Sequence, residues 1–176
     1  MKKRVFTIVA LATILGLLVT GTAAAGSNRT AFTGTYQIIS EGWPERYWEP
    51  GRNVAFWRGM PFLFAITTTY QGVNGMSCIN HNGNYRPSPD DPGPGVQGQM
   101  WGEIHIESDY DRDCTNSLNY WEGTFVGDRA PDGSEHLRYN LKGYGAYAGL
   151  QLRMEQWAGT GAPYFTVSGE VLNPGK

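Results

Sequence analysis

Three polar residues in the stretch QMWGEIHIE alternate with two isoleucines, and their types suit acid–base or metal chemistry. Glu103, His105 and Glu107 lie two residues apart, so on a β-strand their side chains share one side with Trp101. A histidine between two carboxylates can hold a metal ion or transfer a proton. The isoleucines supply the buried face, which favours a solvent-facing polar set; in a barrel with a polar lumen the same set would face inward.

A second acidic cluster follows in the stretch SDYDRDCTN. Asp109, Asp111 and Asp113 alternate in a way that can supply hard oxygen ligands to calcium. The EF-hand pattern is not met, because Cys114 takes its glycine position and Tyr120 takes the place of its final glutamate. We favour a solvated turn over a calcium site, and we expect no metal and no cofactor.

Other signatures of catalysis are missing from the sequence. It contains no GxSxG, HExxH, P-loop or dinucleotide fingerprint. His81 lies in the stretch INHNGN and His136 follows PDGS, so both are expected at turns on the surface. The sequence therefore assembles no set of nucleophile, base and orienting residue.

An aromatic-rich segment, EGWPERYWEPGRNVAFW, spans residues 41–57. Pro44 and Pro50 would damage a central strand or a helix, so we predict a long connection across one end of the fold. We expect this connection to act as a plug, with at least two of its three tryptophans mostly buried. These are Trp43, Trp48 and Trp57.

Arginines lie among these rings. Arg46, Arg52 and Arg58 can stack on aromatic faces and pair with neighbouring glutamates, which is the structural interpretation we favour. The alternative is recognition of an anionic or sugar-like ligand.

Alternation with a period of two dominates the rest of the chain. Segments such as FLFAITTTY, YWEGTFVG and LRYNL predict seven or eight strands, and turn signals fall at residues 82–84, 131–133 and 159–163. This pattern indicates an all-β barrel or sandwich, and the glycines inside the strands favour a small barrel. We predict a single antiparallel eight-stranded barrel.

The first 25 residues predict a secretory signal peptide. They combine the basic start MKKR, a short apolar run and a small-residue cleavage site; the alternative is an uncleaved N-terminal anchor. Residues 26–176 would then form one extracytoplasmic domain, secreted or periplasmic. Without Lys2, Lys3 and Arg4, 11 basic residues face 16 acidic ones, a net charge of −5. This charge argues against nucleic acid and, after cleavage, against a membrane surface as partner.

Two cysteines, Cys78 and Cys114, are present. In an exported chain the expected state is one disulfide between them, worth about 4 kcal/mol in the chain-entropy model. The alternative interpretation is two separate thiols or one reactive nucleophile.

The segment from Lys142 to Val171 resembles the C-terminal part of the allene oxide cyclase family and, more loosely, the dirigent proteins. The resemblance rests on a glycine-rich turn between strands and on a following aromatic strand. The turn contributes Gly143, Gly145, Tyr147 and Gly149, and the strand contributes Tyr164, Phe165 and Gly169. The resemblance implies an eight-stranded barrel with an internal cavity and a trimeric assembly.

The N-terminal strand departs from that family. Where the family has a glutamate after a tyrosine, this chain has Gln37 after Tyr36, so the resemblance implies the fold and not the reaction. The stretch TGTYQ is also similar to the first strand of avidin-like and lipocalin-like barrels.

These observations favour a barrel that binds a small, mostly apolar molecule in or at its mouth. The alternatives are an isomerase or cyclase, with Glu103, His105 or Glu170 as the ionisable group, and a secreted module that binds proteins or glycans. The expected ligand-binding residues are Tyr36, Trp43, Trp48, Trp57, Tyr70, Trp101, Glu103 and His105.

Overall fold

The computed structural model describes residues 28–51, 54–86, 97–108, 114, 117–159 and 164–175. The predicted signal peptide, Arg52 and the three alternating aspartates lie outside these residues. Among the described residues, no helix has the length and apolar character needed to span a membrane.

The described chain forms nine β-strands and two short 3-10 turns, and it contains no α-helix. The strands are β1 (Arg29–Glu41), β2 (Arg46–Gly51), β3 (Val54–Thr68), β4 (Gly75–Arg86), β5 (Gln97–Glu107), β6 (Tyr120–Arg129), β7 (Glu135–Gly143), β8 (Gln151–Ala158) and β9 (Phe165–Leu172). The turns are η1 (Gln71–Val73) and η2 (Gly145–Tyr147).

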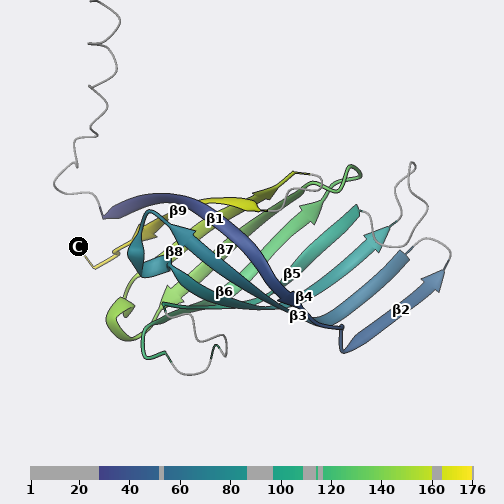
Figure 1. Ribbon diagram of the computed structural model, residues 1–176, viewed down its shortest axis with the longest axis horizontal. Helices are drawn as coiled ribbons and strands as arrows, with labels where there is room; N and C mark the ends of the chain where they lie inside the picture. Colours follow the sequence, from purple (N-terminus) through teal and green to yellow (C-terminus); the bar gives the residue numbers. More distant parts are fainter. Residues whose placement is uncertain are drawn as a thin grey trace, which may run out of the picture.

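Eight of these strands close into an antiparallel barrel, as predicted. The sheet runs β1-β9-β8-β7-β6-β5-β4-β3-β2, and β1 also pairs with β3, so every strand except β2 lies in the closed ring (Figure 1). Closure leaves the eight ring strands with hydrogen-bonded neighbours on both sides, which removes most free sheet edges. Strand β2 pairs with the first part of β3 and projects beyond the ring.

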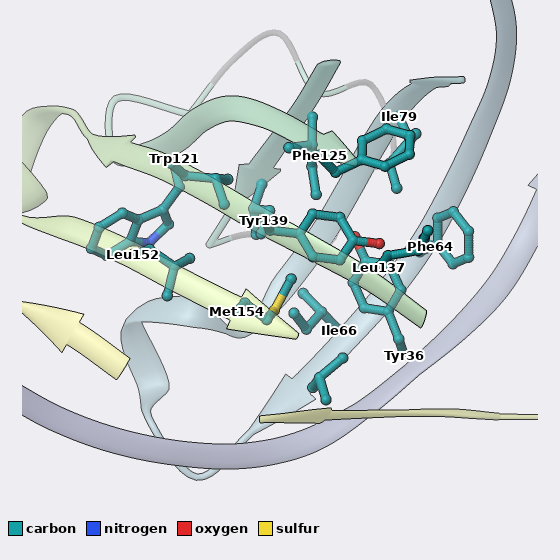
Figure 2. Packing of buried hydrophobic residues seen from close by; sticks show 14 of the residues in the cluster. Tyr36, Phe64, Ile66, Ile79, Trp121, Phe125, Leu137, Tyr139, Leu152 and Met154 are labelled. Carbon is teal, nitrogen blue, oxygen red and sulfur yellow. The ribbon is translucent and has the colours of Figure 1, made fainter. Parts of the chain in front are cut away.

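Inward-facing side chains from the alternating positions of the strands pack together inside the barrel (Figure 2). At one end Trp121 stacks on Tyr147 at 4.9 Å, and its indole Nε1 donates to the Gly72 carbonyl at 2.6 Å. Tyr147 belongs to the glycine-rich turn between β7 and β8, so the aromatic residue of that turn helps to close this end. We call this the closed end.

A β-bulge in β3 changes which residues face the interior. The register shifts between Trp57 and Met60, and Gly59 adopts a positive φ of 67°. The bulge adds one residue to β3 and so shifts the alternation by one position. As a result Trp57, before the bulge, and Met60, after it, both face inward. The Gly59 N–H donates to the Asn82 side chain at 3.2 Å, which secures the bulge against β4.

The aromatic-rich segment is a hairpin, and the predicted connection across the barrel end is wrong. Strand β3 begins at Val54, so the segment pairs along β3 as β2 instead of crossing the mouth. Its prolines are tolerated because Pro44 lies in the break after β1 and Pro50 lies near the end of an edge strand. Trp57 is partly buried, Trp48 is 41% exposed and Trp43 is 92% exposed, so two of the three are less than half exposed.

The predicted disulfide is present between Cys78 and Cys114. Cys78 lies on β4 and Cys114 lies in the connection between β5 and β6. The bridge therefore ties this connection to the barrel wall.

Candidate functional site

A cavity of about 500 Å³ opens at the end of the barrel opposite the closed end. Its walls come from all eight ring strands and the connections beside them. They include Ile38, Trp43, Trp57, Met60, Phe62, Phe64, Ile79, His81, Tyr85, Met100, Phe125, Arg129, Glu135, Leu137, Gln156, Ala158 and Phe165. We call this space the mouth cavity; its size suits a small molecule, and most of its lining is apolar.

Aromatic rings surround His81 within the mouth cavity. The imidazole centroid lies 5.5 Å from that of Phe62, 6.1 Å from that of Phe125 and 6.4 Å from that of Trp57. Phe62 and Trp57 lie on β3, which neighbours β4, and Phe125 lies on β6, beyond β5 in the other direction around the ring. They keep water away from the imidazole.

His81 forms a hydrogen bond with Tyr85, four residues further along β4. The Tyr85 hydroxyl lies 2.8 Å from His81 Nε2. Burial, with a smaller effect from the charge of Arg129, lowers the pKa of His81 to about 4, so the imidazole is neutral at pH 7. Burial also raises the pKa of Tyr85, with a further rise from Glu135, so the phenol stays protonated.

An ion pair lies at the rim of the same cavity. Arg129 Nε lies 3.6 Å from Glu135 Oε1, across the hairpin between β6 and β7. Burial raises the pKa of Glu135, and the neighbouring guanidinium partly offsets that rise. The pair brings one positive and one negative charge to an otherwise apolar mouth.

Two further polar pairs satisfy groups in the barrel interior. The Tyr139 hydroxyl donates to Gln156 Oε1 at 2.5 Å, and the Tyr36 hydroxyl donates to Ser77 Oγ. Tyr36 and Ser77 are fully buried, and Tyr36 stacks on Phe64 at 4.6 Å. Because Phe64 lines the cavity and Tyr36 does not, Tyr36 supports the cavity floor from behind.

The residues predicted to bind a ligand fall into three groups. Trp43 and Trp57 line the mouth cavity. Tyr36 lies behind its floor, and Tyr70 packs at the closed end beside η1. Trp48, Trp101, Glu103 and His105 lie on outer surfaces, so the structure does not bring the eight residues together.

Trp48 and Trp101 have a structural partner on the outer surface. The guanidinium of Arg58 lies 5.2 Å from the Trp48 ring centroid and 4.8 Å from that of Trp101. Arg58 also donates to the Gly83 carbonyl and to the Asn84 side chain, both at 2.9 Å. These contacts fasten the hairpin to the barrel wall, which is the structural role favoured from the sequence.

The polar face of β5 points away from the barrel, since Ile104 and Ile106 fill the interior. Glu103 is exposed, but Glu107 is buried, with 1% of its surface exposed, which corrects the expectation of a fully solvated face. Glu107 Oε1 lies 3.0 Å from His105 Nε2, and the His105 ring stacks on Tyr120 at 4.6 Å. The described residues contain no group of three histidine, cysteine or acidic side chains placed to hold a metal ion.

The sequence interpretation missed the polar residues of the mouth, above all His81. The predicted turn at residues 82–84 is wrong, because β4 runs without interruption from Gly75 to Arg86. Asn82 and Asn84 are occupied with the β3 bulge and Arg58, and Gly83 makes room for the Tyr85 ring, only 2.1 Å from where a Cβ would lie. The period-two series Ser77, Ile79, His81, Gly83 and Tyr85 was the signal that could have placed His81 inside.

Fold and site together define a closed β-barrel with a mouth cavity that is largely apolar and carries one polar side. No protein-family model matches the chain, and no curated protein matches it either.

Proposed function

We propose that this chain is an exported β-barrel protein that binds a small, mostly apolar molecule in its mouth cavity. The mouth cavity is the observation that carries the proposal. It offers about 500 Å³ lined by aromatic and aliphatic side chains, whereas the core below it is filled. A ligand would be confined to the mouth, with its apolar body against Phe62, Phe64 and Phe125.

A screen of small apolar compounds by intrinsic tryptophan fluorescence tests the proposal. Trp43 and Trp57 line the cavity, so a ligand should change their emission saturably. Ala158→Phe places a ring inside the mouth and should weaken binding at least about tenfold, the effect of losing roughly 1.4 kcal/mol. Ser168→Phe, on the outer face of β9, is the matched control and should bind as the wild type does. Failure of every compound to bind, or equal binding by both variants, would count against the proposal.

An isomerase or cyclase activity is the second candidate. The ionisable residues first considered for it do not line the mouth cavity, but His81 does, neutral beside Tyr85 among aromatic rings. A neutral imidazole shielded from water can accept a proton from a bound substrate. Loss of turnover in His81→Gln with binding retained would support this candidate.

A surface interaction module is the third candidate. The observation in its favour is the row of exposed rings on and before β2, where Trp43, Tyr47 and Trp48 are 92%, 49% and 41% exposed. Exposed aromatic residues of this kind are typical of docking surfaces for proteins or glycans.

Export and family membership also belong to the proposal. The disulfide supports an extracytoplasmic location, and the signal-like first 25 residues support secretion or a periplasmic location. N-terminal sequencing of the exported protein should give a start at Gly26. The resemblance to the allene oxide cyclase family supports a trimer, which sedimentation of the purified protein would test.

A further inference from the structure

Two N–H donors at the mouth cavity have no hydrogen-bond partner among the described residues. They are Trp57 Nε1 and Arg129 Nε, both buried, and each belongs to a side chain that lines the cavity. The 3.6 Å from Arg129 Nε to Glu135 is within ion-pair distance but too long for a hydrogen bond. Because these atoms are shielded from solvent, water does not compensate them, and a buried donor without a partner is unfavourable.

The two donors flank the His81–Tyr85 pair. The Trp57 and Tyr85 ring centroids lie 5.0 Å apart on neighbouring strands. On the other side, Gly98 separates Tyr85 from Arg129 in the sheet, and glycine has no side chain to come between them. Arg129, His81 and Tyr85 all line the same cavity, which places the guanidinium on the same side of the mouth as the pair.

The His81–Tyr85 pair adds a donor of its own. A neutral imidazole and a phenol carry two polar hydrogens between them, and their mutual hydrogen bond uses one. In either tautomer one N–H or O–H hydrogen is left over. A purely apolar ligand would therefore offer no acceptor to these N–H and O–H donors on the polar side of the mouth.

The charges at the mouth do not favour an anion. Arg129 is already paired with Glu135, and Glu41 adds a second carboxylate to the lining. Apart from His81, which is neutral, the lining thus has two negative groups against one positive group. A second anion would have to compete with Glu135 for the guanidinium.

We infer that the ligand of the mouth cavity is a neutral molecule with a carbonyl oxygen, such as a ketone, ester or lactone, on an apolar body. This inference rests on the proposed function. The oxygen would accept hydrogen bonds from the Trp57 and Arg129 N–H groups after side-chain rotation at the rim, and the apolar body would contact the aromatic wall. A ligand whose only polar group is a donor would leave both N–H groups without a partner.

Calorimetric titration with three probes of one framework tests the inference. The probes are 2-acetylnaphthalene, which has a neutral carbonyl, 2-ethylnaphthalene, which has no acceptor, and 2-naphthoate, which is an anion. The ketone should bind about tenfold more tightly than the hydrocarbon, the effect of one or two added hydrogen bonds. It should also bind more tightly than the anion.

Two variants locate the effect. Trp57→Phe keeps a ring but removes its N–H, and Arg129→Lys keeps the charge beside Glu135 but removes the Nε donor. Each should weaken ketone binding about three- to tenfold and leave hydrocarbon binding within twofold. Trp157→Phe, on the outer face of β8, is the control and should change neither affinity.

The outcomes separate the two proposals. Equal affinities for ketone and hydrocarbon, or tightest binding of the anion, would overturn the inference while leaving a ligand-binding mouth intact. Absence of binding by all three probes would remove the proposed function and the inference with it.

Discussion

The Tyr85 hydroxyl lies 2.8 Å from Nε2 of His81, and both side chains project from β4 into the mouth cavity. Aromatic rings cover the imidazole, so its protonated form loses the stabilisation that water would give it. This pair therefore links the pH of the solution to the stability of the barrel mouth.

Stability should fall as the pH is lowered through the range in which His81 is protonated in the unfolded chain only. Its pKa falls from 6.5 to about 4 on folding because burial disfavours the charged form. Between these values the unfolded chain binds more protons, so the free energy of unfolding decreases as the pH falls. Above about pH 6.5 the free energy of unfolding keeps this contribution in full. By pH 4 the free energy of unfolding has fallen by an amount on the order of 3 kcal/mol.

Urea unfolding at several pH values, together with an NMR titration of the imidazole, measures this effect. His81→Phe should flatten the stability profile between pH 6.5 and 4. Ser168→Ala, an exposed position on the outer face of β9, should keep the profile of the wild type. An imidazole of His81 that titrates near pH 6.5 in the folded protein would contradict the account.

Removing one partner of the Tyr36–Ser77 hydrogen bond should destabilise the protein more than removing both partners together. Both residues are fully buried, so Tyr36→Phe leaves the Ser77 hydroxyl without a partner, at a cost of about 1–3 kcal/mol. Adding Ser77→Ala should recover part of that loss, which a double-mutant cycle in urea would reveal. Ligand affinity should stay within about twofold, since the Tyr36 side chain does not line the cavity. Strict additivity would contradict this assignment.

Much of the barrel could be predicted from alternation alone. From β5 to β9 the inward residues follow a strict period of two, as with Leu137, Tyr139 and Leu141, because each strand has one buried and one exposed face. The disulfide followed from two cysteines in a chain with a signal-like start.

The mouth could not be predicted in the same way. The bulge at Gly59 changes the inward set of β3 from odd to even positions, and no period-two rule locates such a shift in advance. Asn82 and Asn84 looked like turn residues because their side chains usually bond to nearby backbone, whereas here they serve β3. His81 was consequently placed at a turn, and the polar side of the cavity was missed.

Substitution of Gly59 should show how strongly the bulge needs a left-handed residue. Gly59→Ala should destabilise the protein by about 1–2 kcal/mol, because φ is +67° and a Cβ is disfavoured there. The three atoms nearest the added methyl would all belong to the Glu45 side chain, which can move. Gly59→Asn should be milder, since asparagine tolerates this conformation better. Equal stability of wild type and Gly59→Ala in urea would show that the bulge relaxes.

Removal of the disulfide should destabilise the barrel substantially. Cys78 and Cys114 are 36 residues apart, so the bridge restricts the unfolded chain and contributes about 4 kcal/mol in the chain-entropy model. The double variant Cys78→Ser/Cys114→Ser should lose about that much in urea unfolding. Reductant should lower the stability of the wild type and leave the double variant unchanged; a wild type insensitive to reductant would contradict the expectation.

The central claim, that the mouth cavity binds a small apolar molecule, is tested most directly by the indole N–H resonances of the six tryptophans. A titration of ¹⁵N-labelled protein with 2-acetylnaphthalene and 2-ethylnaphthalene would report on all six sites at once. The account predicts saturable shifts of Trp57 and Trp43, which line the cavity, and unchanged resonances of Trp121 at the closed end and Trp157 on the outer face. An unshifted Trp57 resonance, or shifts confined to Trp48 and Trp101 on the outer surface, would contradict it.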